Sequence, residues 1–574
     1  MEFPMQKNYF LFGCLIFIVL AVIAFFIGLN LPMRKVSSYS MPAKSDSWLL
    51  LNPSGVVTDY SEVEYGFMGK NQSVADICAK LRAAATDKNV KGILIRPVFS
   101  QLGMSGLDEI AEALKEFKKS GKPVLAHLEM QSQKDYLLAA LADTISMEPA
   151  SSAGIFMDGV MTNVSFYKGL LDKLGLKVNV IRSGEFKGYG ETYSRKDLSE
   201  ETYSNLKELL SDRYELLISY IASQRKLSPD KVKAVFEQRP DYLVTAEYAK
   251  QAGLVDVVSG RDEFLKSHSI ERKQLLDMQD YTPKPVSVNT RDKIAVCYLQ
   301  GGITISSVSQ YQDGITAAKV QKMVDALNED SRIKAVVFRV NSPGGSALES
   351  EIIYRKLEML KSKMPVVISM SGTAASGGYY ISAPANYIVA DPYTVTGSIG
   401  VIQLLPDASE LSKKAGITNQ TIGFGKYAGA MNFMNPPSQD LLASLQRNSE
   451  NVYSEFKHRV AKYRKVDYDS LENLAGGRVW SAQDALANRL VDKIGTLDTA
   501  IKKAAELAKL SAYQTVVLPE KKQYFELFME QLKNLPTAKA AFTPDSYLDL
   551  LAEQFKAIFK PYTALCLMPF ELES

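Results

Sequence analysis

The chain has 574 residues, of which 46% are hydrophobic and 23% charged, a balance typical of globular domains rather than of disordered chains. Its 67 basic and 64 acidic residues leave a net charge of +3, which gives no reason to expect nucleic acid as a partner. The four cysteines lie far apart without a CxxC pair, and only three histidines occur. We therefore expect no disulfide framework, no metal and no cofactor.

An uncharged apolar run of 21 residues lies at 9–29. As a helix it would be about 31 Å long, which matches a bilayer core of about 30 Å. A cleaved signal peptide is the alternative, but its apolar region would be only about 7–15 residues long and followed by small residues. We therefore predict a flank at 1–8 and a transmembrane anchor at 9–31. The lysine and arginine residues on either side slightly favour a cytoplasmic body.

The rest of the chain repeats itself. Segments 87–96 and 330–339 are alike, and so are segments 249–256 and 485–492, with two further matches in the same order between them. The offset falls from 243 residues in the first pair to 236 in the last. Four ordered matches at such a long period indicate a tandem duplication of a domain.

Each copy alternates short apolar strands with helical patterns, which predicts an α/β fold built from βαβ units and a mostly parallel sheet. The predicted strands are 92–98, 124–128, 335–340 and 366–370, and the predicted helices are 107–119, 194–225, 348–361 and 437–465. We predict a first repeat at 45–285, a second repeat at 290–511 and a helical C-terminal extension at 512–574.

The second copy contains a serine at a predicted strand-to-helix junction. Ser376 is surrounded by alanine and glycine, which would let a substrate backbone come close. A tight turn or a helix N-cap would explain the same serine. Gly344 and Gly345 open another helix directly after a strand, where N–H groups could stabilise an oxyanion. The first copy lacks both features and has Gln133 or Lys134 at the position of Ser376.

A nucleophilic serine needs a general base. No histidine follows Ser376 in its own copy except His458, which lies on a predicted outer helix. A buried lysine can serve instead, because burial favours its neutral amine. Lys187 and Lys426 occupy similar glycine-rich loops at a repeat offset of 239 residues. The residues alone leave the choice between these two lysines open.

Three motifs of the second copy, at 341–345, 374–380 and 397–400, resemble those of the protease IV / signal peptide peptidase A family. The tandem arrangement resembles the long form of that family. This resemblance implies two crotonase/Clp-protease-like α/β domains and a Ser/Lys dyad peptidase.

The resemblance also implies roles for individual residues. Ser376 matches the nucleophile, Gly344 and Gly377 match the oxyanion hole, with Gly345 beside them, and Ser398 matches a serine that orients the lysine. In the long form the base comes from the first copy, which selects Lys187. Whether Lys187 reaches the serine of its own chain or of a neighbouring subunit stays open.

From this resemblance we expect a single-pass protein of the bacterial inner membrane with its body on the periplasmic side. We prefer this location to the cytoplasmic one that the flanking charges slightly favour. The expected activity is ATP-independent cleavage of signal-peptide remnants and other short hydrophobic peptides, since no Walker-type GxxxxGK[ST] motif is present. The expected partners are these peptides, the bilayer through residues 9–31, and further copies of the chain, a tetramer by resemblance. A crotonase-like acyl-thioester enzyme and a catalytically silent membrane scaffold are the alternatives.

Overall fold

The computed structural model describes residues 42–64, 72–283, 290–305, 314–430, 432–523 and 565–567. The predicted anchor at 9–31 and most of the predicted extension at 512–574 lie outside these residues. Among the helices in the described part of the chain, none combines the length and the apolar character that spanning a bilayer requires.

The first copy is built on a parallel sheet of six strands in the order β12-β8-β6-β4-β1-β13. The strands are β1 (Ser47–Leu51), β4 (Val90–Ile95), β6 (Val124–Leu128), β8 (Thr144–Met147), β12 (Val257–Val258) and β13 (Leu275–Asp277). All five residues of β6 are buried, as expected for a parallel strand with both faces covered. Helices α2 (Val74–Thr86), α3 (Met104–Lys118) and α4 (Gln133–Ala139) belong to the same copy.

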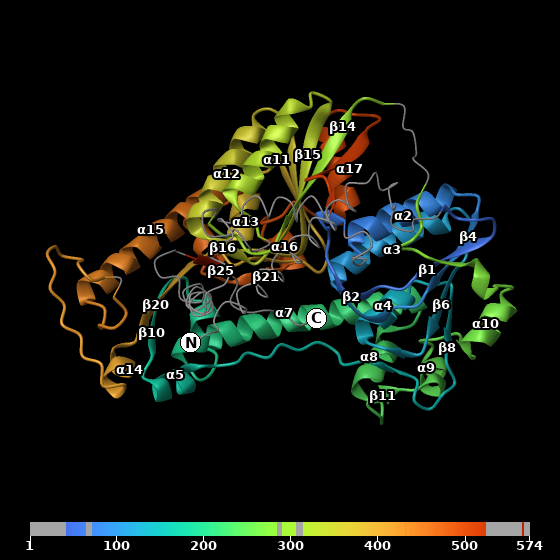
Figure 1. The fold of residues 1–574 in the computed structure, drawn as a ribbon, viewed down its shortest axis with the longest axis horizontal. Helices are drawn as coiled ribbons and strands as arrows, with labels where there is room; N and C mark the ends of the chain where they lie inside the picture. Colours follow the sequence, from blue (N-terminus) through green and yellow to red (C-terminus); the bar gives the residue numbers. More distant parts are fainter. Residues whose placement is uncertain are drawn as a thin grey trace, which may run out of the picture.

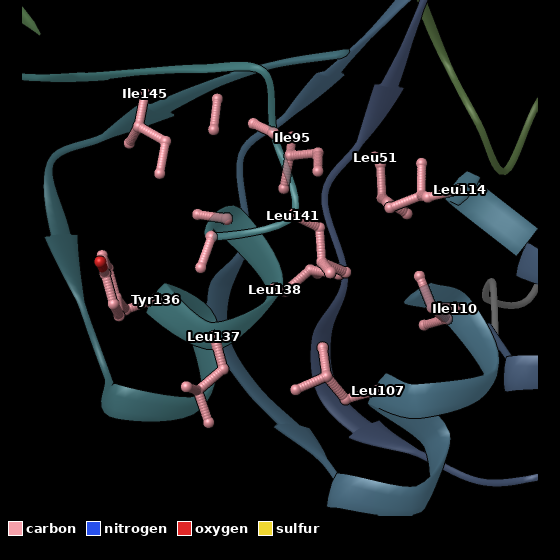
Figure 2. Close-up of a cluster of buried hydrophobic side chains, with 14 of the residues drawn as sticks. Leu51, Ile95, Leu107, Ile110, Leu114, Tyr136, Leu137, Leu138, Leu141 and Ile145 are labelled. Atoms are coloured by element: carbon pink, nitrogen blue, oxygen red, sulfur yellow. The ribbon is translucent and has the colours of Figure 1, made fainter. Parts of the chain in front are cut away.

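The core of the first copy is formed by side chains from the sheet and from these helices. In Figure 2, Leu51 and Ile95 from the strands lie beside Leu107 and Ile110 from α3, with Leu138 of α4 between them. The apolar side chains of α3 recur every three or four residues, so one face of the helix is buried against the sheet.

The second copy repeats this architecture in a sheet with the order β21-β19-β17-β15-β14-β23. Beside this row of strands, β18 pairs with β17, and β22 pairs with β18. The strands are β14 (Lys293–Gln300), β15 (Ile333–Ser342), β17 (Val366–Ala375), β18 (Tyr387–Ala390), β19 (Val395–Gly397), β21 (Val479–Ser481), β22 (Lys493–Ile494) and β23 (Gln514–Leu518). All neighbouring pairs run parallel except β19 and β21. The predicted alternation of strands and helices is therefore present in both copies.

The expected start of the helical extension at residue 512 is wrong. Residues 514–518 form β23, which pairs in parallel with β14 and completes the edge of the second sheet. The physical reason is the β-branched run at 515–517, which favours a strand, and the packing of Val516 and Leu518 against the core of the second copy. Near the end of the chain, residues 565–567 form a further strand, β25, where we expected helix.

Equivalent helices and ion pairs in the two copies show the duplication directly. Each copy has a 26-residue helix, α7 (Glu200–Arg225) or α15 (Gln439–Arg464), that ends at a lysine in the left-handed conformation. The last residue of each helix is an arginine that binds an aspartate, Arg225 to Asp256 at 2.6 Å and Arg464 to Asp492 at 2.9 Å. The two copies therefore share details of their side-chain packing as well as their topology.

A small sheet joins the two copies, in the order β10-β20-β25-β16. Its strands are β10 (Lys177–Ser183) of the first copy, β20 (Val401–Asp407) and β16 (Gly344–Ser346) of the second, and β25 (Leu565–Leu567). β10 and β20 pair antiparallel over seven residues, and Figure 1 shows them side by side at one end of the molecule. Because β10 pairs with β20, the segment that follows β10 lies against the second copy.

A buried ion pair also connects the copies. Arg339 on β15 is 1% exposed, and its guanidinium lies 3.2 Å from the carboxylate of Glu109 on α3 and 4.0 Å from that of Asp59. The same guanidinium donates hydrogen bonds to the hydroxyls of Ser369 and Ser371. Burial raises the pKa of Glu109 to about 7, and the nearby Arg339 opposes this shift. Removing one partner would leave the other charge buried without compensation.

We predict that Arg339→Met lowers the free energy of unfolding by about 3–5 kcal/mol, because it leaves Glu109 and Asp59 buried and unpaired. Adding Glu109→Gln should recover part of this loss. Urea unfolding of the full chain measures both effects. Arg332→Met is the matched control, since Arg332 pairs with Asp330 at the surface, and it should change stability little. Equal effects of Arg339→Met and Arg332→Met would contradict a structural role for the buried pair.

Candidate active site

Ser376 lies at the junction between β17 and α13 (Gly377–Ser382). Its backbone has φ 55° and ψ −117°, a strained conformation for a residue other than glycine. The backbone N–H of Ser376 donates to the carbonyl of Gly397 at 2.8 Å, which helps to hold this conformation. Ser376 occupies the N-cap position of α13, but its side chain makes no capping hydrogen bond to the helix.

The hydroxyl of Ser376 instead meets the amine of Lys187. The Nζ of Lys187 lies 2.7 Å from the Oγ of Ser376, and it lies 2.9 Å from the carbonyl oxygen and 3.0 Å from the Oγ of Ser398. All three residues are fully buried. Burial of this kind disfavours the charged form of an amine.

Ser398 reaches the cluster from the strand beside Ser376. It directly follows β19, whose Gly397 pairs with Ala375 of β17. The backbone of Ser398 has a positive φ of 53°, and its N–H donates to the carbonyl of Arg478 at 2.7 Å. Neighbouring strands therefore end at Ser376 and Ser398, and the amine of Lys187 lies between these two residues.

The loop that carries Lys187 is held by two glycines of the second copy. The N–H of Phe186 donates to the carbonyl of Gly476 at 2.8 Å. Gly477 has φ +83°, and a Cβ atom at this position would lie only 2.7 Å from the N and 2.9 Å from the Cα of Lys187. Sequence reasoning missed this pair, although two adjacent glycines just before a strand are a recognisable signal for close backbone approach.

A buried carboxylate anchors the other side of the same loop. Glu191 is 3% exposed at the start of α6 (Glu191–Ser194) and accepts hydrogen bonds from the N–H and the hydroxyl of Ser199 at 2.8 and 2.6 Å. Arg182, at the end of β10, pairs with the same carboxylate at 3.2 Å. Glu191 therefore ties together the segments before and after Lys187.

The predicted oxyanion-hole glycines lie close to one another. A Cβ atom on Gly377 would be 3.2 Å from the Cα of Gly344 and 3.2 Å from the N of Gly345. Both Gly344 and Gly345 have positive φ values, 102° and 154°. The N–H of Gly344 donates to the hydroxyl of Ser342 at 3.2 Å. Gly344, Gly345 and Gly377 therefore lie close together beside Ser376.

The other candidate bases lie outside this buried cluster. The side chain of Lys426 is 60% exposed and pairs with Asp440 at 3.3 Å. His458 lies on the exposed side of α15, where its Nδ1 is 2.7 Å from the carbonyl of Ser454. Of the two lysines that the sequence left open, the structure brings Lys187 to Ser376.

The equivalent position in the first copy has a different structure. Tyr136 and Tyr379 donate matching hydrogen bonds to the carbonyls of Leu254 and Leu490, which aligns Gln133 with Ser376. Helix α4 there begins with an ordinary capping box, in which the Ser132 hydroxyl accepts from the N–H of Asp135. The carboxylate of Asp135 accepts a hydrogen bond from the Ser100 hydroxyl at 2.7 Å. In the first copy, polar side chains therefore bind one another at the position where the second copy has Ser376.

Comparisons with known proteins agree with this arrangement. The model for peptidase family S49 matches residues 116–275 and 358–511, one segment in each copy, and the model for Clp protease matches residues 292–389. Protease 4 of Haemophilus influenzae is 32% identical over 522 residues, which cover 84% of this chain and 83% of that protein.

Two further relatives extend this similarity. Serine protease SPPA, chloroplastic, of Arabidopsis thaliana is 31% identical over 76% of this chain and 66% of its own length. Putative signal peptide peptidase SppA of Enterococcus faecium is 37% identical over 32% of this chain and 54% of its own length. The predicted family and the predicted Clp-protease-like α/β fold are confirmed.

We predict that Gly477→Ala lowers kcat/KM for peptide hydrolysis at least about tenfold, because its Cβ would push the backbone of Lys187 away from Ser376. Gly416→Ala is the matched control, since Gly416 also has a positive φ, +71°, but has open space around its Cβ position. Both variants place alanine at a positive φ, so Gly416→Ala controls for backbone strain, and circular dichroism verifies that both variants are folded. Equal activity of the two variants would show that Gly477 does not position the lysine.

Proposed function

Because the chain belongs to peptidase family S49, we propose that Ser376 and Lys187 are the catalytic dyad of this serine peptidase. The observation that carries the proposal is the distance of 2.7 Å between the Oγ of Ser376 and the Nζ of Lys187 in a fully buried setting. This is hydrogen-bonding distance, as direct proton transfer between a nucleophile and its base requires.

In the proposed reaction, the Oγ of Ser376 attacks the carbonyl carbon of a peptide bond while its proton moves to the Nζ of Lys187. Backbone N–H groups of the cluster formed by Gly344, Gly345 and Gly377 stabilise the negative charge on the carbonyl oxygen. Lys187 then gives the proton to the leaving amine, and the C–N bond breaks. Water hydrolyses the resulting ester and restores Ser376, with Lys187 again as the base.

Ser398 has a positioning role in this proposal. Its carbonyl and its hydroxyl both lie within hydrogen-bonding distance of the Nζ of Lys187. Since a lysine side chain has several rotatable bonds, two fixed partners restrict the amine to the side of the site that faces Ser376.

The proposed site is divided between the two copies. The first repeat, which we place at 45–285, contributes the base, and the second repeat contributes the nucleophile and the oxyanion hole. We extend the second repeat from 290–511 to residue 518, since β23 belongs to its sheet. The antiparallel pairing of β10 with β20 supports this division, because it directs the lysine loop into the second copy.

We further propose that the peptidase is anchored in the bacterial inner membrane through residues 9–31 with its body on the periplasmic side, and that it forms homo-oligomers. Its proposed substrates are signal-peptide remnants and other short hydrophobic peptides, and its turnover is independent of ATP. The apolar run at 9–29 supports the anchor. The relative from Enterococcus faecium is named as a putative signal peptide peptidase, which supports the substrate class.

We predict that Ser376→Ala and Lys187→Met each lower kcat/KM for an apolar peptide at least about 10³-fold, because the members of a nucleophile–base pair act as a unit. Lys426→Met is the matched control. It removes an exposed repeat-related lysine and should retain most of the activity. The measurement is hydrolysis of a fluorogenic apolar peptide by the full-length chain in detergent, after gel filtration and circular dichroism have verified the fold.

The opposite pattern, with Lys426→Met inactive and Lys187→Met active, would place the base in the second copy. Retained hydrolysis in Ser376→Ala would exclude this serine as the nucleophile. Absence of hydrolysis by the unaltered chain on every apolar peptide tried would instead favour a catalytically silent scaffold.

A further inference from the structure

An arginine of the second copy lies beside the loop at residues 184–190 that carries Lys187. Arg478 follows Gly477, the glycine that meets the backbone of Lys187, and it directly precedes β21. Only 26% of its side chain is exposed. The proposed reaction gives this arginine no role, although it lies next to the segment that must hold the general base in place.

The backbone of Arg478 is connected to both members of the proposed dyad. Its carbonyl accepts a hydrogen bond from the N–H of Ser398 at 2.7 Å, and Ser398 contacts the Nζ of Lys187 through its own carbonyl and hydroxyl. The strand that follows Arg478, β21, pairs antiparallel with β19. The last residue of β19, Gly397, accepts the N–H of Ser376 at 2.8 Å. A displacement of this segment would therefore disturb the base and the nucleophile together.

The guanidinium of Arg478 lies over two aromatic rings. Its central carbon is 4.3 Å from the ring centre of Trp480 and 5.5 Å from that of Phe186. A planar guanidinium is attracted to the face of an aromatic ring and can lie flat against it. Phe186 is the residue before Lys187, so this contact holds the side chain next to the base.

A helix of the first copy gives the same guanidinium a fixed partner. Glu208 on α7 forms an ion pair with the Nη2 of Arg478. One turn away on the same helix, the side chain of Asn205 exchanges two hydrogen bonds with the backbone of Val479, at 2.9 and 3.0 Å. Leu209 packs in one apolar cluster with Val479. Positions 205, 208 and 209 share one face of α7, so this face binds the segment that contains Arg478.

We propose that Arg478 is a positioning residue for the general base. Its side chain holds Phe186, directly before Lys187, and its carbonyl holds Ser398, which contacts the amine of Lys187. The proposal requires the planar guanidinium and not only a positive charge, because an ammonium cannot lie flat on a ring. The inference rests on the proposed peptidase function and deepens it, since it names a residue that orients the base without touching the substrate.

The first test separates kcat from KM. Arg478→Met should lower kcat for the fluorogenic apolar peptide at least about tenfold and change KM less than about twofold, because it displaces the base and removes no substrate contact. Arg478→Lys should be nearly as slow. Arg272→Met is the matched control, since Arg272 is 69% exposed and pairs with Asp262, and it should keep both constants. An unchanged kcat in Arg478→Met, or a loss confined to KM, would overturn the proposal.

A second set of variants separates the two contacts of the guanidinium. Phe186→Leu should reproduce most of the loss seen in Arg478→Met. The double variant should be no slower than Arg478→Met alone, because both changes remove the same contact. Glu208→Gln keeps the contact with the ring and should lower kcat less than about threefold, since a partly exposed ion pair contributes little. Additive losses in the double variant would overturn the role of the ring contact.

Chemical rescue tests the requirement for a planar group. Arg478→Ala leaves space for the missing guanidinium, so guanidinium chloride below the concentration that unfolds the chain should raise kcat of this variant at least about threefold. Methylammonium carries the same charge without the plane and should not raise it. A variant that is merely misfolded would gain from neither salt. Absence of rescue by guanidinium, or equal rescue by methylammonium, would overturn the proposal.

Hydrogen exchange of backbone amides tests the positioning without turnover. In full-length Arg478→Met, residues 184–190 should exchange at least about tenfold faster than in the unaltered chain, whereas the buried strand β6 should keep its rate. Arg272→Met should match the unaltered chain in both segments. If no variant hydrolyses peptides, the peptidase function fails, and this readout still decides whether Arg478 holds the loop. Unchanged exchange at 184–190 in a folded Arg478→Met chain would overturn the proposal.

Discussion

The site depends on one contact between the two copies. The amine of Lys187 lies 2.7 Å from the hydroxyl of Ser376. A lysine side chain is long and flexible, so its backbone must be fixed before its amine can be fixed. The pairing of β10 with β20 brings the loop to the second copy, Gly477 allows the two backbones to touch, and Glu191 holds the segments on either side. The strained backbone at Ser376 then directs the hydroxyl to the amine.

The proposed site divides the catalytic residues between the two copies. In this proposal the first copy supplies the base, and Lys426 of the second copy lies at the surface, where it pairs with Asp440. In the same proposal the second copy supplies the nucleophile, and the first copy has an ordinary capping box at the start of α4. The buried ion pair between Arg339 and Glu109 is a further contact between the two copies.

The sequence allowed the α/β alternation to be predicted, because apolar runs and helical periodicity are local signals. Ser376 could be named from its motif, and repeat positions narrowed the base to Lys187 and Lys426, between which the family resemblance chose Lys187. The pairing of β10 with β20 could not be predicted, since a contact between distant segments leaves no periodic pattern. Gly476 and Gly477 acquire their importance only through the backbone of Lys187. The short strands β23 and β25 were missed because a few residues beside helical patterns carry little strand signal.

The central claim is that one chain supplies both members of the dyad. The most direct measurement mixes full-length Ser376→Ala with full-length Lys187→Met, through co-expression, and compares the hydrolysis of an apolar peptide with that of each variant alone. If the dyad forms within one chain, every chain in the mixture lacks one member, so the mixture should be as inactive as the separate variants. Recovered turnover in the mixture would contradict the claim and place the lysine of one subunit beside the serine of another.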